Sequence, residues 1–146
     1  MKKVLFLLFF LFFNFETNAE EQYLSLKNKK VNVRYCPELN CPIKYIYRKI
    51  NYPVKQIDKK ENFRKIIDIK KNSGWIHISQ LKKSKSFIIM KDKILFKKPS
   101  FFSKPILKLE KGRLVLVKKC QSEWCKVKTD DYLGWLNIEN IWGYVD

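Results

Sequence analysis

Apolar and polar residues alternate along most of this chain with the two-residue period of a β-strand. Residues 23–27 and 31–35 alternate on either side of a polar turn at residues 28–30, a pattern typical of a β-hairpin. Further short runs follow, and turn-favouring residues such as Asn51 and Gly112 precede two of them. No apolar stripe persists at helical spacing beyond about one turn. The pattern therefore predicts an all-β protein.

Two segments, residues 31–81 and 94–141, have the pattern of one β module written twice. The matched positions are Pro42-Ile43 with Pro105-Ile106, Asn62-Phe63 with Glu123-Trp124, and Gly74-Trp75-Ile76 with Gly134-Trp135-Leu136. The offset between them falls from 63 to 61 to 60 residues, as expected when a duplicated unit changes its loop lengths. We expect a first module in residues 20–90, a second in residues 91–146, and a hinge at residues 91–93.

Alternate residues of a strand point to opposite faces, so each Gly-Trp strand has an aliphatic face. Ile76 and Ile78 share this face in the first module, and Leu136 and Ile138 share it in the second. Large aliphatic side chains are the ones most often buried. We therefore expect these four residues in the cores of the two modules.

The opposite face of these strands and of their neighbours carries aromatic and basic side chains. We expect Trp75 and His77 to point outward in the first module, and Trp124, Lys126 and Trp135 in the second. An indole ring among lysines can stack on another ring, on an apolar sugar face or on a peptide, while the ammonium groups attract anions. These five residues form the candidate binding site. The alternative is that the rings cover the contact between the modules.

The first 19 residues have the organisation of a secretory signal peptide. Lys2 and Lys3 precede an apolar run at residues 4–13, and Thr17-Asn18-Ala19 resembles a cleavage site. The run is shorter than the roughly 20 residues that cross a bilayer, which disfavours the alternative of an uncleaved anchor. We expect a periplasmic or secreted protein that begins at Glu20 and has no membrane span after cleavage.

The chain is strongly basic, with 31 Lys and Arg residues against 14 Asp and Glu residues and a net charge of +17. Arginine contributes only four of these cations, and Ala19 is the sole alanine, a composition typical of an AT-rich genome. The lysines are then either a solvated surface set by codon bias or a means of attracting a polyanion. The charge alone does not choose between nucleic acid, anionic lipid and cell-wall polymer.

Four cysteines form two pairs with equal spacing, Cys36 with Cys41 and Cys120 with Cys125. Exported proteins meet an oxidising compartment, where such pairs persist as disulfides. Each closed loop is short, so we expect each bond to stabilise its module by about 2 kcal/mol. A four-cysteine zinc site is the alternative, but the pairs lie in different repeats and are spaced more widely than is usual for zinc. We expect no bound metal.

The sequence contains no recognisable catalytic motif. His77 is the single histidine. With the cysteines oxidised, no thiol is available for it to activate, and we expect no local pair between His77 and Ser79. Glycine-rich phosphate loops and histidine-based metal motifs are missing from the sequence. We expect a protein that is not an enzyme and binds no cofactor.

Several short motifs, in the same order in both copies, resemble the bacterial Src-homology-3 (SH3)-like domain family, in particular its exported tandem form in Gram-negative bacteria. They are Val31-Asn32-Val33-Arg34, Tyr52-Pro53-Val54, Asn62-Phe63-Arg64-Lys65-Ile66 and Gly74-Trp75-Ile76-His77, followed by Trp124-Cys125-Lys126-Val127, Gly134-Trp135-Leu136 and Ile141-Trp142-Gly143. The resemblance implies two tandem, small, strongly bent SH3-like β-barrels after the cleaved signal peptide. It also implies modules that attach proteins to cell-wall peptides or mediate protein contacts.

These observations predict an exported, non-catalytic binding or scaffold protein of the cell envelope. The expected partner is a cell-wall peptide of peptidoglycan or an envelope protein. The alternative is a basic protein that binds polyanions or nucleic acid, although nucleic acid is not the expected partner. A purely structural interaction module is a third interpretation.

The leader and the cysteine pairs together predict the mass of the exported protein. We expect a chain that begins at Glu20 and weighs four hydrogens less than its fully reduced form, as intact mass spectrometry can measure. A reduced, metal-loaded protein with four free thiols would contradict this prediction.

Overall fold

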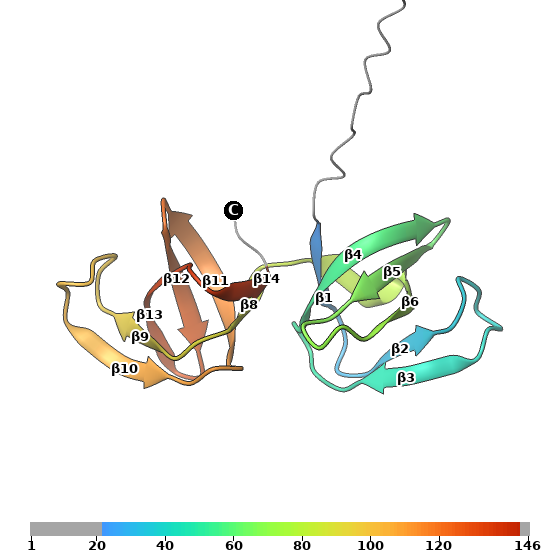
Figure 1. Cartoon of the computed structure of the whole chain (residues 1–146), viewed down its shortest axis with the longest axis horizontal. Helices are drawn as coiled ribbons and strands as arrows, with labels where there is room; N and C mark the ends of the chain where they lie inside the picture. The colour runs from blue at the N-terminus through green and yellow to red at the C-terminus, as the bar shows by residue number, and fades with distance from the viewer. Residues whose placement is uncertain (1–21, 144–146) are drawn as a thin grey trace, which may run out of the picture.

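A computed structural model describes residues 22–143 as two curled antiparallel sheets in tandem (Figure 1). The expected signal peptide lies outside the described residues. The first sheet contains β1 (Tyr23–Leu26), β2 (Val31–Arg34), β3 (Ile43–Tyr47), β4 (Pro53–Lys60), β5 (Phe63–Ile67), β6 (Ser73–His77) and β7 (Leu81–Lys83). The second contains β8 (Ser86–Ile89), β9 (Lys93–Phe96), β10 (Pro105–Leu109), β11 (Leu114–Gln121), β12 (Trp124–Thr129), β13 (Tyr132–Asn137) and β14 (Ile141–Gly143).

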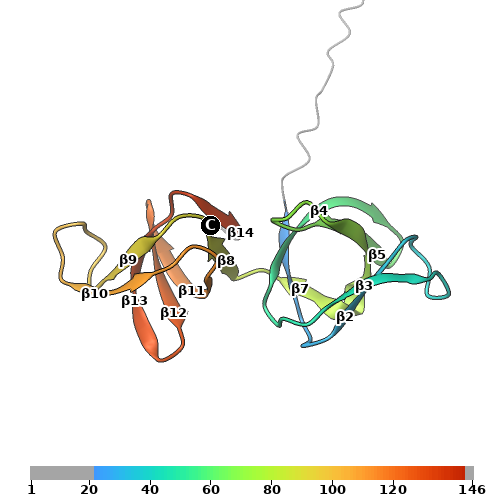
Figure 2. The same ribbon diagram turned by 60° about the horizontal axis from the view of Figure 1, so that its bottom comes forward.

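The two sheets have the same strand order, which confirms the predicted all-β tandem fold. The first runs β3-β2-β6-β5-β4-β1-β7 and the second runs β10-β9-β13-β12-β11-β8-β14, so adding seven to each strand number converts one into the other. Figure 2 shows the strands of each module curling around their own interior. In the described part of the chain, no helix is long and apolar enough to span a membrane, and η1 (Ile78–Gln80) is a single 3-10 turn.

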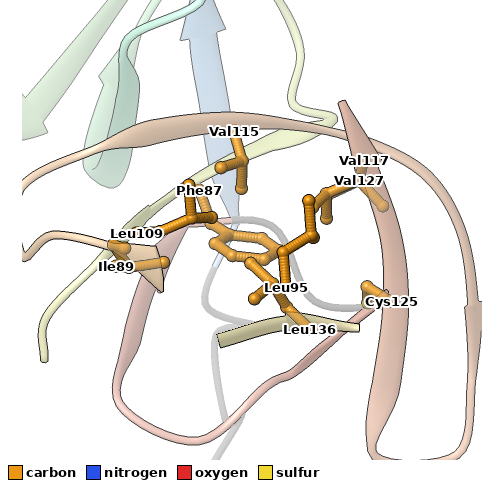
Figure 3. Close-up of a cluster of buried hydrophobic side chains, with 9 residues drawn as sticks. All are labelled: Phe87, Ile89, Leu95, Leu109, Val115, Val117, Cys125, Val127 and Leu136. Atoms are coloured by element: carbon orange, nitrogen blue, oxygen red, sulfur yellow. The ribbon is translucent and has the colours of Figure 1, made fainter. Parts of the chain in front are cut away.

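Each module encloses its own small apolar core. In the second module Phe87 lies at the centre of a cluster to which strands β8 to β13 contribute (Figure 3). Its buried members are Phe87, Ile89, Leu95, Leu109, Val115, Val117, Cys125, Val127 and Leu136. The core of the first module consists of Leu26, Val31, Val33, Val54, Ile66, Ile76 and Leu81. Because domains of about 60 residues bury only about 60% of their unfolded surface, additional constraints stabilise these modules.

Two turn residues adopt the same left-handed conformation at equivalent places. Asn51 has φ 63° and Gly112 has φ 90°. The Asn51 N–H donates to the Leu26 carbonyl and the Gly112 N–H donates to the Ile89 carbonyl, both at 2.8–2.9 Å. Asparagine and glycine tolerate positive φ better than other residues. The pattern of turn residues therefore located the start of β4 and β11 correctly.

The first two strands do not form the hairpin that their pattern indicated. β1 pairs with β4 and β7, whereas β2 pairs with β3 and β6. Leu26 and Val31 are both fully buried in the same core. The polar turn between them therefore takes the chain from one part of the curled sheet to another, and only the strand positions were predicted correctly.

The junction between the modules lies nearer the N-terminus than the hinge expected at residues 91–93. Sequence analysis assigned residues 86–90 to the first module, but β8 pairs with β11 and β14 of the second sheet. Ser84 and Lys85 are thus the only residues between the sheets. β8 belongs to the second module because its residues Phe87 and Ile89 are buried in the core of that module.

A buried serine cluster holds this junction. The Ser25 hydroxyl donates to the Ser84 hydroxyl at 2.9 Å, and Ser86 Oγ lies 2.8 Å from Ser25 Oγ. Ser86 also donates to the Asn51 carbonyl at 2.6 Å. On the same side, the Trp142 indole N–H donates to the Pro53 carbonyl at 3.3 Å. These bonds join the two modules through groups that are satisfied within the protein.

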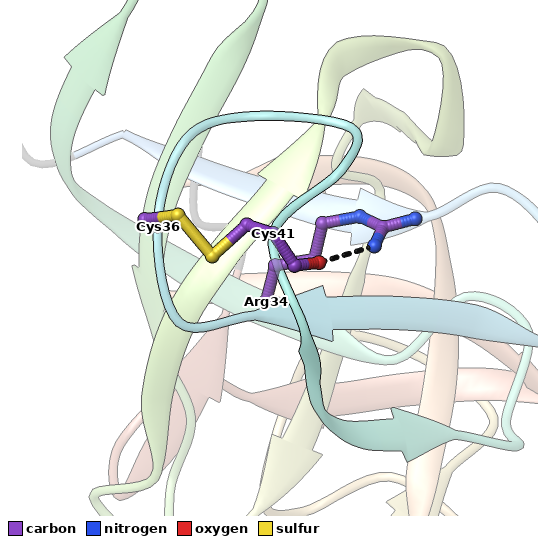
Figure 4. The surroundings of a disulfide bond; sticks show 3 residues. All are labelled: Arg34, Cys36 and Cys41. Carbon is purple, nitrogen blue, oxygen red and sulfur yellow. Dashed lines mark hydrogen bonds between the residues drawn. A yellow bond between two sulfur atoms is a disulfide. The ribbon is translucent and has the colours of Figure 1, made fainter.

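Both expected disulfides are present, although they constrain different parts of the repeat. Cys36–Cys41 closes the loop between β2 and β3, where an Arg34 guanidinium N–H donates to the Cys41 carbonyl at 2.7 Å (Figure 4). Cys120–Cys125 joins the facing strands β11 and β12, and Cys125 is part of the core. The two cysteine pairs have equal spacing in the sequence, but they lie at positions that are not equivalent in the two modules.

Burial of the four predicted aliphatic residues differs from the expectation at one site. Ile76 and Leu136 are fully buried and Ile138 packs partly against the second core, but Ile78 is 43% exposed. β6 ends at His77, and the following 3-10 turn rotates Ile78 out of the strand alternation. The expectation for Ile78 was wrong because it extended the strand by one residue.

Replacing Ile76 or Leu136 by Ala should lower the free energy of unfolding by about 2–4 kcal/mol, because each leaves a cavity in a small core. Ile78→Ala is the matched control, and we expect a change within about 0.5 kcal/mol at this exposed site. Urea denaturation of the three variants measures the difference. Equal losses at all three positions would contradict the assignment of the core.

Candidate functional site

The register of the strands aligns a row of outward side chains in each module. In the second module, Phe96 of β9 lies beside Trp135 of β13, which lies opposite Lys126 of β12 and then Lys119 of β11. The equivalent row in the first module is Arg34, Trp75, Lys65 and Asp58. The Trp and the central Lys are thus retained, whereas both ends of the row differ.

A glycine allows the closing strands of each module to approach one another. A Cβ atom at Gly134 would lie 2.7 Å from Leu95, 2.8 Å from the Phe96 carbonyl oxygen and 2.9 Å from Ile106. A Cβ atom at Gly74 would collide with the Val33 side chain and would lie 3.1 Å from the Arg34 carbonyl oxygen. The glycine before each tryptophan is therefore a steric requirement of the fold. In the second module, the close approach at Gly134 brings Phe96 of β9 next to the Trp135 backbone of β13.

Three aromatic rings meet at the end of the second module, and we call Phe96, Phe101 and Trp124 the aromatic cluster. The Phe101 and Trp124 ring centroids are 4.7 Å apart, Phe96 and Trp124 are 5.8 Å apart, and Phe96 and Phe101 are 6.0 Å apart. All three contacts are edge-to-face, the preferred geometry of aromatic pairs. Phe101 remains 64% exposed and Trp124 is half-buried. The cluster therefore presents aromatic surface to solvent.

A cavity of about 230 Å³ adjoins this cluster and carries charges of both signs. Its lining residues are Asp92, Lys93, Ile94, Phe96, Phe101, Asn137 and Glu139. Burial lowers the pKa of the Lys93 ammonium group, and the nearby Glu139 carboxylate opposes that decrease. The backbone N–H of Lys111 donates to Asp92 at 2.8 Å and lowers the pKa of the Asp92 carboxyl. The cavity thus combines an apolar aromatic wall with one ammonium and two carboxylates.

The five predicted site residues do not form one surface. Trp124 is in the aromatic cluster, and Lys126 lies two residues along the same strand. Trp75 and His77 lie on β6 of the other module, where both are half-buried. The structure therefore brings together only the candidates of the second module.

Trp135 points outward, but its ring is covered. Only 7% of the residue is exposed, and Lys119 Nζ lies 5.6 Å from the ring centroid in a cation–π contact. Strand alternation gave the correct face but not the covering side chains, since Lys119 comes from β11, two strands away. Trp135 therefore does not offer an open ring to a ligand.

The first module lacks an equivalent open cluster. Phe63, which matches Trp124, is only 6% exposed, and the His77 ring packs edge-on against it at 5.1 Å. Sequence analysis also expected no local pairing of His77 with Ser79, and this was wrong. The Ser79 hydroxyl lies 2.7 Å from His77 Nδ1, and the Ser79 N–H donates to the same nitrogen at 3.2 Å. This arrangement caps η1 and gives His77 a structural role.

Sequence analysis did not identify a buried acidic centre in the first module. Asp68 is 2% exposed and accepts hydrogen bonds from the Tyr47 hydroxyl, the Asn72 side chain and two backbone N–H groups. Burial raises the pKa of Tyr47 well above its usual value, and its hydrogen bond with Tyr45 adds to the increase. The spacing of Tyr45, Tyr47 and Tyr52 places their rings in contact at 5.2–5.6 Å. The satisfied hydrogen bonds indicate structural stabilisation.

A second recess, of about 670 Å³, lies between the modules and is rich in cations. The first module contributes Lys49, Ile50 and Asn51, and the second contributes Glu110, Lys111, Arg113, Leu114, Leu116, Lys118, Lys128, Thr129 and Asp130. Arg113 pairs with Asp130 at 3.0 Å, and the lysines line the recess without an ion pair of their own among the described residues. No cluster of potential metal ligands occurs among residues 22–143.

Comparison with known families identifies the class of the second module. Residues 92–143 match the bacterial SH3 domain family. This match confirms the predicted resemblance, and it covers the module that carries the aromatic cluster. A comparison with curated proteins finds no match.

Two solved structures show a distant similarity to the chain. NlpC2 from Trichomonas vaginalis is 15% identical over 86% of this chain and 50% of that chain, with a TM-score of 0.39. NlpC1 from the same organism is 13% identical over 83% of this chain and 45% of that chain, with a TM-score of 0.38. The chain thus spans about half the length of these proteins.

Trp135→Ala should unfold at lower urea concentration than Trp124→Ala. The loss expected for Trp135 is about 3 kcal/mol, because removing a covered Trp leaves a cavity, whereas Trp124 is half-buried. Chemical denaturation of both variants tests this order. The interpretation would be wrong if Trp135→Ala matched the wild-type midpoint.

Proposed function

We propose that this protein is an exported, non-catalytic binding protein of the cell envelope, and that its second module holds a peptide ligand. The observation that carries the proposal is the aromatic cluster beside a cavity of mixed charge, within the module that matches the bacterial SH3 domain family. The ligand we favour is a peptide of the cell wall, with a peptide segment of an envelope protein as the other form of the same partner.

The chemistry of the cavity suits a short peptide with both amino and carboxylate groups. Glu139 supplies a negative charge for a ligand amine, and Lys93 supplies a positive charge for a ligand carboxylate. Asp92, the other carboxylate of the cavity, is paired with Lys108 at 3.1 Å. The exposed faces of Phe101 and Trp124 can pack against aliphatic atoms of the ligand. Three groups of different character at one place favour a zwitterionic ligand over a simple polyanion.

The two disulfides support an extracytoplasmic location. Disulfides persist in oxidising compartments and are rare where thiols are kept reduced. The leader expected at residues 1–19 supports the same location. Export to the envelope would place the binding module in the compartment of its proposed ligand.

We propose no catalytic role, and the environment of His77 supports this view. His77 Nδ1 accepts the Ser79 N–H in an exposed capping arrangement, and Phe63 packs against the imidazole ring. Catalytic Ser–His pairs need a third group that orients the base and donors that stabilise an oxyanion. The described contacts of His77 supply neither.

The recess between the modules favours one alternative function, the binding of a polyanion. Five basic residues line it against two acidic ones, and they come from both modules. Such a site attracts anions through charge, and its affinity falls steeply as salt rises. A zwitterionic peptide at the aromatic cluster would be far less sensitive to salt.

Isothermal titration with purified cell-wall peptides tests the proposal. Trp124→Ala should weaken binding by about fivefold or more, because aromatic anchors dominate the energetics of such sites. Trp75→Ala is the matched control in the first module, and we expect its affinity to equal that of the wild type.

Two outcomes of the titration would contradict the proposal. One is equal loss of affinity in the Trp75 and Trp124 variants. The other is binding that disappears in high salt and in Lys128→Ser while surviving Trp124→Ala, which would favour the polyanion alternative and its recess.

A further inference from the structure

The loop between β9 and β10, residues 97–104, lies at the outer end of the second module (Figure 1). It contains two exposed phenylalanines, Phe101 and Phe102. Phe102 is 101% exposed, so its ring has essentially no contact with the rest of the protein. Phe101 is 64% exposed and keeps one side against Trp124. A fully exposed ring beside a partly exposed one makes an apolar projection, which differs from a scattered surface hydrophobe.

The loop has already satisfied much of its own backbone. Five hydrogen bonds lie within it: Lys97 N to Lys104 O, Lys98 N to Ser103 Oγ, Ser100 N to Lys98 O, Phe102 N to Ser100 Oγ, and Ser103 N to Ser100 O, at 2.8–3.2 Å. Pro99 has no N–H to satisfy. A loop normally stays out of an apolar medium because its unpaired backbone groups would lose their hydrogen bonds to water. Since many of its N–H groups are already paired, this loop can leave water at a lower cost in free energy than an ordinary loop.

The base of the loop is fixed to the barrel. Phe101 packs edge-on against both Phe96 and Trp124, so the loop is anchored on the side opposite its exposed tip. A preorganised loop loses little conformational entropy when its tip is immobilised. The backbone at Phe102 is therefore fixed at the tip of the loop, with its N–H donated to Ser100 Oγ, and its ring is exposed to solvent.

The charges on the loop define what the tip can approach. Lys97, Lys98 and Lys104 flank the phenylalanines, and residues 97–104 contain no acidic residue. Lysine side chains reach toward phosphate while their methylene stems lie along apolar material. Phenylalanine with flanking lysines is the composition of segments that lie in the interface of an anionic bilayer.

The equivalent loop of the first module has the opposite character. Residues 35–42 also expose apolar side chains, with Tyr35 63% and Leu39 67% exposed. They contain no lysine, however, and they include Glu38 and the Cys36–Cys41 disulfide. Lys44 of β3 lies over the exposed Tyr35 ring, with its Nζ 5.7 Å from the ring centroid. Exposure of a ring is thus common to both loops, whereas only residues 97–104 carry lysines within the loop itself.

We propose that residues 97–104 form a membrane-docking loop. The Phe102 ring enters the interfacial region of a bilayer with an anionic surface, and Lys97, Lys98 and Lys104 bind the lipid phosphates around it. The loop attaches the protein to the surface of the bilayer and does not cross it. Phe101 is shared with the proposed peptide site, but Phe102 and the three lysines do not line the cavity of that site.

Flotation of the exported protein with lipid vesicles tests the proposal. We expect binding to vesicles of phosphatidylcholine and phosphatidylglycerol in equal parts, weaker binding to phosphatidylcholine alone, and a decrease of binding with salt. Phe102→Ser should lower the partition coefficient by about tenfold or more, because a whole aromatic side chain no longer leaves water. Lys98→Ser should lower it by a smaller factor.

Leu39→Ser is the control, because it removes an apolar side chain that is 67% exposed from the equivalent loop, which contains no lysine. All variants carry the same N-terminus, so any contribution of that end is common to them. Phe102 makes no packing contact, and thermal denaturation should show wild-type stability for its variant.

A second variant reports the depth of the tip directly. In Phe102→Trp, lipids with brominated acyl chains should quench the added indole when the anionic vesicles are present. The proposal is overturned if the wild type binds neither type of vesicle, if Phe102→Ser binds as well as the wild type, or if Leu39→Ser loses as much binding. It is equally overturned if the Phe102→Trp indole stays unquenched while the protein is bound.

Discussion

The close crossing of β9 and β13 at Gly134 is the constraint on which the second module depends. A side chain at this position would collide with Leu95, with Ile106 and with the Phe96 carbonyl. The crossing joins one end of the sheet to its centre through the single pair Trp135 and Phe96. The same crossing places Leu95 in the core and its neighbour Phe96 in the aromatic cluster.

The two modules share one topology but present different surfaces. The crossing at Gly74 repeats the geometry in the first module, but Arg34 replaces Phe96 there and donates to the disulfide-closed loop. His77 then covers Phe63 at the position of the half-exposed Trp124. In the first module these positions stabilise the local structure, whereas in the second module they leave aromatic surface in contact with solvent. The serine cluster at the junction joins both to one unit.

Much of the fold was predictable from local patterns, and the errors have physical causes. Strand alternation, the Gly-Trp pairs and the cysteine spacing gave the two modules, the buried Ile76 and Leu136, and both disulfides. Alternation cannot say which strands pair, so the first hairpin and the hinge were misplaced. Strand alternation also stops where the 3-10 turn begins at Ile78, so Ile78 is exposed and not buried as alternation predicted. The covering of Trp135 by Lys119 depends on a strand two positions away in the sheet, and no local pattern reports such a contact.

We propose that ligand binding belongs to the second module and not to the first. The four tryptophans provide a direct test, since each indole N–H gives its own signal in a two-dimensional ¹H–¹⁵N NMR spectrum. During titration with purified cell-wall peptide, the Trp124 indole signal should shift progressively while the Trp75 signal stays in place. A shift of the Trp75 signal with the Trp124 signal unchanged, or no shift of either at saturating peptide, would show that the second module is not the peptide-binding module.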